Sequence, residues 1–289
     1  GRDEERQGGV ERHVQVFFGS DRTYSADAAR LGERFGTERG ELKLGRLNVS
    51  IPPGHETGEV ERPSWLRLQF RENPSKHVML TELMCDSEAD FLRNLGIQLA
   101  ANDNPSAFVF VHGYNVSFED AALRTAQIAL DVGLASTPLF YSWPSKDGLA
   151  RYTVDEANAE WTRPNLLKFL ELIAENSPAR DIVVIAHSMG SRPVTWALDQ
   201  LMSRRPELRE KFSELVLAAP DIDAAVFQRD ILPALAPLHP HVTLYASSKD
   251  RALAASKFVH GSPRLGESGE SLVVAAGMDT IDASVIETD

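Results

Sequence analysis

Short runs of apolar residues recur through most of the chain after residue 100, separated by segments in which apolar residues follow a helical spacing. A run that is apolar at nearly every position is typical of a strand buried on both faces of a sheet. Strands of this kind that alternate with helices indicate βαβ units and a mostly parallel sheet. The predicted strands are Ala107–His112, Pro138–Trp143, Asp181–Ala186, Glu214–Ala219, Val242–Ala246 and Leu272–Ala276.

Helical periodicity fills the segments between these strands. In one of them Leu166, Leu167, Leu170 and Ile173 share a face. Before another, Ser117 is the expected N-cap residue and Asp120 its capping-box partner. We therefore expect an α/β fold with helices on both faces of the sheet. The predicted helices are Asp86–Ala100, Phe118–Val132, Arg163–Asn176, Ser191–Arg204, Phe227–Leu238 and Leu253–Phe258.

The beginning of the chain has a different pattern. Residues 1–12 are polar and aperiodic, which is typical of a flexible tail. The following residues, up to about Leu83, alternate polar and apolar positions and predict antiparallel strands at one edge of the same sheet. The region from 13 to 289 is interpreted as a single domain. The predicted early strands are His13–Phe18, Glu41–Ser50, Trp65–Phe70 and His77–Leu83, with a Pro- and Gly-containing loop at Ile51–Arg62.

Composition narrows the possible partners. The chain has 289 residues, 30 Lys and Arg against 42 Asp and Glu, and a formal net charge of −12. This balance argues against nucleic acid or an anionic membrane surface as the main partner. The one cysteine, Cys85, excludes an intrachain disulfide and a four-cysteine zinc site. The long uncharged run Ile231–Ser248 contains prolines, so no membrane-spanning helix is predicted.

The sequence is compatible with a cytoplasmic and with an exported protein, and it predicts no particular oligomeric state. A single cysteine is compatible with the cytoplasm and with an exported bacterial protein. Because the chain starts at Gly1 without a methionine, an N-terminal signal or anchor is allowed for.

The strongest chemical signal is the pentapeptide Ala186-His187-Ser188-Met189-Gly190. It lies between an apolar strand and a helix, which is the context of a nucleophile elbow. Such a turn exposes a serine hydroxyl beyond the end of the strand, and the small residues at both ends leave room for it. The N-terminus of the following helix directs backbone N–H groups toward an oxyanion. Ser188 is therefore the predicted nucleophile.

A second glycine-containing turn, His112-Gly113-Tyr114, follows the predicted strand Ala107–His112. We expect the backbone N–H groups of Tyr114 and Met189 to form an oxyanion hole. His112, Gly113 and Trp143 are predicted to line the substrate pocket. Further aromatic candidates for an apolar wall are Tyr114, Tyr141, Tyr152 and Phe227, whereas Trp161 is expected to belong to the core.

Two positions compete for the catalytic acid. Asp250 follows the strand Val242–Ala246 and lies after Ser188, as the order Ser, Asp, His requires. Asp221 and Asp223 follow the strand Glu214–Ala219 and are the alternative. Because ligand-facing groups lie beyond the carboxyl ends of parallel strands, both positions are suitable, and Asp250 is preferred.

Several segments, taken together, resemble one bacterial group of the α/β-hydrolase esterase/lipase superfamily, catalogued as domain of unknown function nine hundred. The similarity covers roughly residues 105–289, and more weakly Val16–Arg22 (VFFGSDR). It implies an α/β-hydrolase fold with Ser188 as nucleophile and Asp250 as acid, and it implies no particular substrate. The matching segments, in order, are VFVHGYNVSFEDA, FYSWPSKDG, IAHSMGSR, LAAPDID, TLYASSKDRAL and DTIDAS.

The general base has two possible sources. His260 is the only one of the eight histidines that follows Asp250. In an α/β hydrolase, however, the base usually follows the last strand, and the resembling family continues past DTIDAS with a Gly-His-Ser segment and a last helix. The sequence therefore predicts either His260 or a histidine beyond Asp289, in which case the 13–289 domain lacks its histidine loop and last helix.

The predicted activity is cofactor-free hydrolysis of small carboxylic esters through an acyl-enzyme. No zinc, haem, nucleotide-binding or phosphate-loop motif is present in the sequence. The segment Ser145–Thr162 has the length of a small lid, which favours a fairly open site for modest esters. The alternatives are a catalytically impaired scaffold used for binding, or an acyltransferase or amidase with the same triad.

Overall fold

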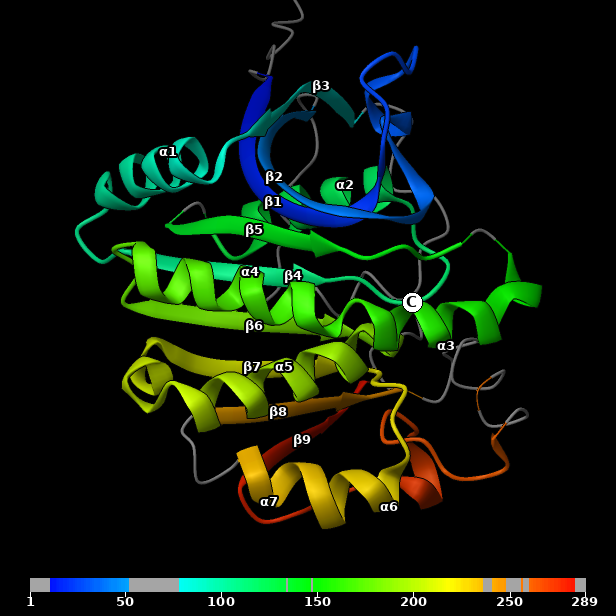
Figure 1. The fold of residues 1–289 in the computed structure, drawn as a ribbon. Coiled ribbons are helices and arrows are strands. Elements are labelled where there is room, and N and C mark those ends of the chain that lie inside the picture. The colour runs from blue at the N-terminus through cyan, green and yellow to red at the C-terminus, as the bar shows by residue number, and fades with distance from the viewer. Residues whose placement is uncertain are drawn as a thin grey trace, which may run out of the picture.

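The computed structural model describes residues 11–51, 78–133, 135–146, 148–235, 241–247, 256 and 260–283. Its described part is built on a nine-stranded sheet with the strand order β3-β2-β1-β5-β4-β6-β7-β8-β9 (Figure 1). The fold class predicted from the sequence is confirmed: helices cover both faces of a mostly parallel sheet, and the N-terminal strands are antiparallel.

The first three strands form the antiparallel edge. Strand β1 (Arg12–Tyr24) pairs with β2 (Phe35–Ile51), and β2 pairs with β3 (Met79–Asp86). Strand β1 then joins the rest of the sheet through a parallel pairing with β5. Three of the predicted early strands are thereby confirmed. The fourth, Trp65–Phe70, and nearly all of the predicted loop Ile51–Arg62 lie outside the described residues.

The remaining six strands are parallel to one another. Five of them agree with the sequence prediction to within two residues at each end. The five are β4 (Ser106–Val111), β5 (Ser136–Ser142), β6 (Asp181–His187), β7 (Phe212–Ala218) and β8 (His241–Ala246), and the sixth is β9 (Met278–Asp282).

The predicted last strand, Leu272–Ala276, is wrong. The strand at this edge is β9 (Met278–Asp282), and the apolar run precedes it as a loop in which Val274 is 72% exposed. In β9 only Met278 is buried. An edge strand needs few apolar residues, so the most apolar run in this region did not mark the strand.

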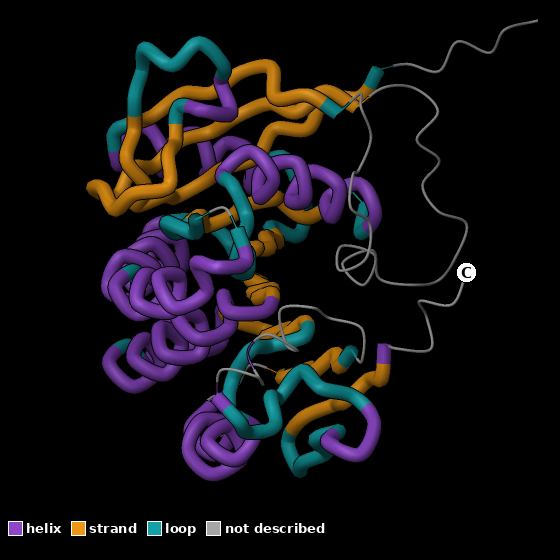
Figure 2. Tube along the Cα trace, turned by 90° about the vertical axis from the view of Figure 1, so that its right-hand side faces the viewer, coloured by secondary structure: helices purple, strands orange, loops and turns teal. Residues whose placement is uncertain are grey.

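Two hydrophobic clusters fill the space on either side of the sheet. One face packs against α1 (Glu88–Ala100), α4 (Arg163–Asn176) and α5 (Ser191–Arg204), and the other against α2 (Phe118–Asp131). Figure 1 shows α4 and α5 in front of the parallel strands and α2 behind them. In the 90° view of Figure 2, most helices lie together on one side of the strands.

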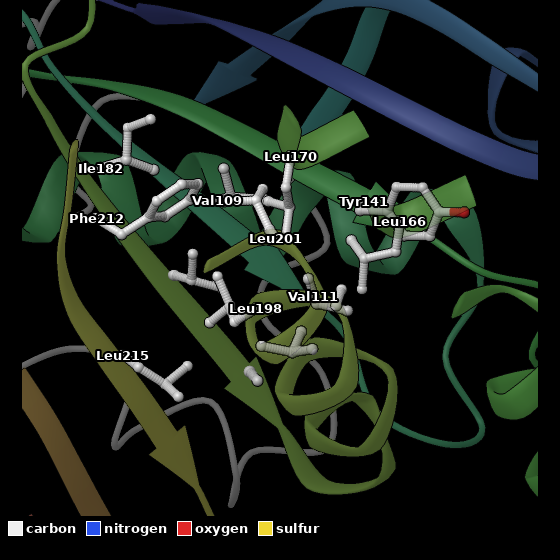
Figure 3. Packing of buried hydrophobic residues seen from close by; sticks show 14 of the residues in the cluster. Val109, Val111, Tyr141, Leu166, Leu170, Ile182, Leu198, Leu201, Phe212 and Leu215 are labelled. Atoms are coloured by element: carbon white, nitrogen blue, oxygen red, sulfur yellow. The ribbon is translucent and has the colours of Figure 1, made fainter. Parts of the chain in front are cut away.

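Side chains from α4 and α5 interdigitate with those of the parallel strands (Figure 3). Leu170 of α4 and Leu198 and Leu201 of α5 meet Val109 and Phe212 of the sheet, and all five are at most 1% exposed. Burial of this extent stabilises each side chain by about 1.5–3 kcal/mol. This packing fixes the position at which α5 begins, directly after the predicted elbow.

Several local predictions can be compared with the structure. The hydroxyl of Ser117 accepts a hydrogen bond from the Asp120 N–H (3.1 Å), so the predicted N-cap of α2 is confirmed. The predicted helix Phe227–Leu238 is divided into a π-helical turn (Phe227–Ile231) and α7 (Leu232–Leu235), preceded by α6 (Ala224–Val226). Residues 236–240 lie outside the described part, as does all of the predicted helix Leu253–Phe258 except Ser256.

Candidate active site

Ser188 follows directly after β6 and has a backbone φ of +50°. This left-handed conformation is uncommon for a residue with a Cβ atom and stores conformational strain. The chain makes one 3-10 turn at Ser188–Gly190 and continues into α5. The sequence therefore folds here into the sharp strand-to-helix turn that defines a nucleophile elbow.

Two glycines allow the elbow and the turn after β4 to approach each other. A Cβ atom on Gly113 would lie 2.8 Å from the Cβ of Ser188 and 3.0 Å from the carbonyl oxygen of His187. A Cβ atom on Gly190 would collide with the carbonyl oxygen of His112. The two turns therefore fit together only because both positions lack a side chain.

The imidazole of His112 fixes the orientation of the turn after β4. Its Nδ1 is 2.7 Å from the carbonyl oxygen of Gly113, which can only accept, so Nδ1 carries the proton. Its Nε2 accepts from the backbone N–H of Trp143 (3.1 Å). Burial, together with the charge of Arg22, holds the pKa of His112 well below 6.5. The ring is therefore neutral, in one tautomer.

The hydrogen bond from His112 to the Gly113 carbonyl also orients the N–H of Tyr114. In a trans peptide the C=O and N–H point in opposite directions. With the Gly113 carbonyl directed at His112, the N–H of Tyr114 is directed away from that ring.

Arg22 lies behind this turn and was not singled out as a site residue from the sequence. Its guanidinium, 1% exposed, donates to the Ser142 hydroxyl (2.8 Å) and to the carbonyl oxygens of Ser145 (3.1 Å) and Val116 (2.6 Å). It therefore holds together the segments that follow β4 and β5. The only signal for it in the sequence is the weak resemblance at Val16–Arg22.

The backbone of Ser188 is firmly held, whereas its hydroxyl makes no hydrogen bond with the described residues. The carbonyl oxygen accepts from the Ser191 hydroxyl (2.6 Å) and from the N–H of Asp221 (3.1 Å). The residue is only 1% exposed, and its Oγ is inaccessible to solvent. A substrate therefore reaches this oxygen only when the groups covering it move.

The structure places His260 in contact with α3 (Tyr152–Trp161). Its Nε2 is 2.9 Å from a carboxylate oxygen of Glu156, and its Nδ1 is 2.8 Å from the carbonyl oxygen of Ser256. These two contacts hold the ring between α3 and the backbone of Ser256. No hydrogen bond joins His260 to Ser188 among the described residues.

Of the three candidate acids, Asp250 lies outside the described residues. Asp221 is fully buried, and its carboxylate accepts from the hydroxyls of Tyr152 and Ser256 and from Arg264 Nε (2.9 Å). A second guanidinium, that of Arg192, lies 3.3 Å from the same carboxylate.

Asp223, the remaining alternative, caps α6 by accepting from the N–H of Val226 (3.0 Å). It also accepts from the Ser262 hydroxyl (2.7 Å). These contacts hold the pKa of Asp223 below its usual value, the helix cap being the larger cause. Neither Asp221 nor Asp223 contacts a histidine among its described partners.

The predicted pocket residues lie behind the two turns. Trp143 stacks on His112 at 5.2 Å between ring centres, and its Nε1 donates to the His112 carbonyl oxygen (2.8 Å). Both side chains have no exposed surface, so in this state neither faces an open pocket. Tyr114 meets Tyr152 edge to face at 5.3 Å. The structure thus brings His112, Gly113 and Trp143 together next to the elbow.

The described residues contain no group of three or more His, Cys, Asp or Glu side chains arranged to hold a metal ion. In the same ranges, no helix has the length and apolar character needed to cross a membrane.

The mixed nine-stranded sheet and the strained serine turn after a central parallel strand define an α/β hydrolase. The chain belongs to the family described as "Alpha/beta hydrolase of unknown function", DUF900, whose model matches residues 87–287. The family predicted from the sequence is thereby confirmed.

A curated relative from Nostoc sp. is described as "Uncharacterized protein alr1448" and is 28% identical over 129 residues. The match covers 36% of this chain and 34% of the relative, so it spans about a third of that protein's length.

Solved structures with similarity include a predicted CIB-like hydrolase from Thermoplasma acidophilum. It has a TM-score of 0.35 and 14% identity, and the match covers 63% of this chain and 77% of that one. An esterase from Pyrobaculum calidifontis has a TM-score of 0.30 and 10% identity, with 83% and 71% covered. Similarities this low carry no argument about the reaction.

Proposed function

We propose that this protein hydrolyses carboxylic esters with Ser188 as the nucleophile. The observation that carries the proposal is the backbone of Ser188, whose φ of +50° holds a residue with a side chain in a strained turn at the end of β6. A strained conformation persists only where the surrounding structure enforces it, and such positions cluster at functional sites. Here the Ser188 carbonyl is held by the Ser191 hydroxyl and the Asp221 N–H, and Gly113 and Gly190 leave room for the turn.

In the proposed reaction, the Ser188 Oγ attacks the ester carbonyl carbon and its proton passes to a general base. The tetrahedral oxyanion is bound by the backbone N–H groups of Met189 and Tyr114. Collapse of this intermediate expels the alcohol, which takes up a proton, and leaves an acyl-serine. Water then attacks the acyl-serine and releases the acid. The hydrogen bond from His112 to the Gly113 carbonyl supports the assignment of Tyr114, because it fixes the peptide that carries this N–H.

Asp250 remains the proposed acid. The described contacts of its two alternatives support this choice. The Asp221 carboxylate accepts hydrogen bonds from Arg264 and from two hydroxyls, and Asp223 caps a helix.

The two sources of the base predicted from the sequence can be separated by one substitution. To accept the Ser188 proton, His260 would have to leave Glu156 and turn toward the elbow. If His260 is the base, His260→Gln lowers kcat by several orders of magnitude. If the base is a histidine following Asp289, the same variant keeps most of its kcat, and His260 serves only in its contact with Glu156.

The proposed activity is tested with p-nitrophenyl acetate and butyrate. We expect the wild type to release p-nitrophenol and to be labelled by a fluorophosphonate, and Ser188→Ala to do neither. Ser203→Ala is the matched control, because it removes an exposed serine hydroxyl from α5, away from the elbow. Equal hydrolysis and no labelling in wild type and Ser188→Ala would refute the proposal.

One observation favours a second function, that of a non-catalytic scaffold. The Ser188 hydroxyl is buried and makes no hydrogen bond with a described histidine. A scaffold predicts no fluorophosphonate labelling at any concentration of the probe, whereas a closed but competent site predicts slow labelling that goes to completion.

A further inference from the structure

A pocket of about 450 Å³ lies beside the elbow, between α5 and the helical stretch from Ala224 to Leu235. Ser188 does not line this pocket, which we call the α5 pocket. Its volume falls within the range that holds small-molecule ligands. His260, one of the two candidates for the base, is among its lining residues, but the mechanism proposed above gives the pocket itself no role.

One part of the α5 pocket is apolar. This wall is lined by Trp196 of α5, by Ile222 from the loop after β7, and by Val226, Ile231 and Ala234. Val226 is 39% exposed, which leaves an apolar surface open at the pocket. Such a wall gains free energy by covering an alkyl or aromatic group.

Another part of the α5 pocket carries guanidinium groups. Arg163, at the first residue of α4, lies over the Trp196 ring with its Cζ 5.9 Å from the ring centre. Its Nε is buried and has no hydrogen-bond partner among the described residues. A buried N–H without an acceptor is costly, so an acceptor from a ligand would be favourable there. Arg264, which is 4% exposed, also lines the pocket and donates from Nε to Asp221.

Three carboxylates also line the α5 pocket, and two of them have partners of their own. Asp223 is engaged in capping α6 and in the bond from Ser262. Asp230 pairs with the exposed Arg229. Asp199, the third, follows Trp196 by three residues on α5.

The network around Asp221 pairs each of its carboxylates with a guanidinium group. Arg192 and His260 both contact the one carboxylate of Glu156, at 2.6 and 2.9 Å. Arg264 and Arg192 share the carboxylate of Asp221. Two carboxylates thus face two guanidinium groups and the imidazole, and Arg163 stands apart from them without an ion pair among the described residues.

We propose that the α5 pocket binds a small amphipathic carboxylate. Its head group lies against Arg163 and Arg264, and the Arg163 Nε–H gains the acceptor that it lacks once the Arg163 side chain turns to uncover it. Its alkyl or aromatic body covers the wall formed by Trp196 and its neighbours. Binding here requires no chemistry at Ser188, so the proposal stands or falls separately from ester hydrolysis.

The test uses sodium octanoate as the probe and the full chain carrying Ser188→Ala, so that turnover plays no part. Isothermal titration should show saturable binding, and the neutral analogue 1-octanol should bind at least about tenfold more weakly, the loss expected for a charge-assisted hydrogen bond. Adding Arg163→Gln should weaken octanoate binding by a similar factor. Adding Ala234→Phe should block binding by filling the apolar wall.

Arg93→Gln is the matched control, because Arg93 is an exposed arginine on α1, far along the chain from the pocket. It should bind octanoate as the parent does, and circular dichroism should show that every variant is folded. The proposal is overturned if the folded parent does not bind octanoate at millimolar concentration. It is also overturned if 1-octanol binds equally well, or if Arg163→Gln and Ala234→Phe both bind like the parent.

Discussion

The Nδ1–H of His112 donates to the carbonyl oxygen of Gly113, its immediate neighbour in the chain, over 2.7 Å. This contact couples a buried, neutral imidazole to the peptide group whose N–H is the proposed oxyanion donor. His112 is therefore a positioning residue, and its role is separable from that of a general base. Because its Nε2 already accepts from the N–H of Trp143, the ring is held from both sides.

Substitution of His112 should lower kcat more than it changes KM. His112→Leu removes the donor to Gly113, and we expect kcat for p-nitrophenyl butyrate to fall by about 10²-fold, as when an oxyanion donor is lost. His112→Asn keeps a donor near the position of Nδ1 and should recover part of the loss. A kcat unchanged from wild type in folded His112→Leu would contradict the positioning role.

Replacement of Ser188 by glycine should stabilise the protein while it removes the nucleophile. The φ of +50° strains any residue with a Cβ, and glycine relieves this strain while deleting a buried hydroxyl that has no described partner. We expect the free energy of unfolding to rise by about 1 kcal/mol. The comparison is Ser191→Gly, which loses the 2.6 Å bond to the Ser188 carbonyl and should be destabilised. Urea unfolding measures both, and destabilisation of Ser188→Gly would argue against strain at the elbow.

A methyl group at Gly113 should disrupt the site. Its Cβ would lie 2.8 Å from that of Ser188, so the two turns would have to separate. We expect Gly113→Ala to lower the free energy of unfolding by about 1–3 kcal/mol and to lower kcat as well. Gly96→Ala is the matched control, because on α1 the nearest atom would be Pro178 Cδ at 3.9 Å. That variant should be as stable as wild type or more so, and equal thermal stability of the two variants would refute the prediction.

Stability should fall with acidification because of His187. Burial, with a smaller contribution from Arg124, lowers the pKa of His187 from 6.5 to about 3. In the unfolded chain the ring takes up a proton near its ordinary pKa, whereas the folded chain does so only near pH 3. Stability is therefore fully present above the unfolded pKa and is lost as the pH falls from 6.5 toward 3, by up to about 1.4 kcal/mol per pH unit.

His187→Asn should reduce this slope, measured by urea unfolding at several pH values above and below the unfolded pKa. The exposed His13 gives the control variant His13→Asn, which should keep the wild-type slope. An identical pH dependence in all three proteins would show that His187 does not carry the effect.

Strong local patterns explain why much of the fold could be predicted. The bounds predicted for α4 and α5 coincide with those observed, Arg163–Asn176 and Ser191–Arg204. Each combines apolar periodicity with a clear beginning, after Thr162 and after the elbow. The last strand was misplaced because an edge strand such as β9 has little need of apolar residues.

The elbow was predictable because its signal is contiguous, from Ala186 to Gly190. The contacts that hold the site in place could not be predicted, because the residues that make them are far apart in the chain. Arg22 reaches the Ser142 hydroxyl across 120 residues, and His260 reaches Glu156 across 104. A single sequence has no local pattern for such pairs, so neither the role of Arg22 nor the position of the His260 ring could be read from it.

The N–H of Asp221 and the carbonyl oxygen of Ser188 are joined by one hydrogen bond of 3.1 Å, and the carboxylate of Asp221 is held by Arg264 at the wall of the α5 pocket. An occupant of that pocket would act on the carboxylate of Asp221 through Arg264, and an acyl group on Ser188 would act on its backbone N–H. If acylation of Ser188 shifts Asp221 and so changes the affinity of the pocket, then pocket binding changes the free energy of acylation by the same amount, because thermodynamic coupling between two sites is reciprocal. Octanoate affinity measured before and after acylation would read out that coupling directly.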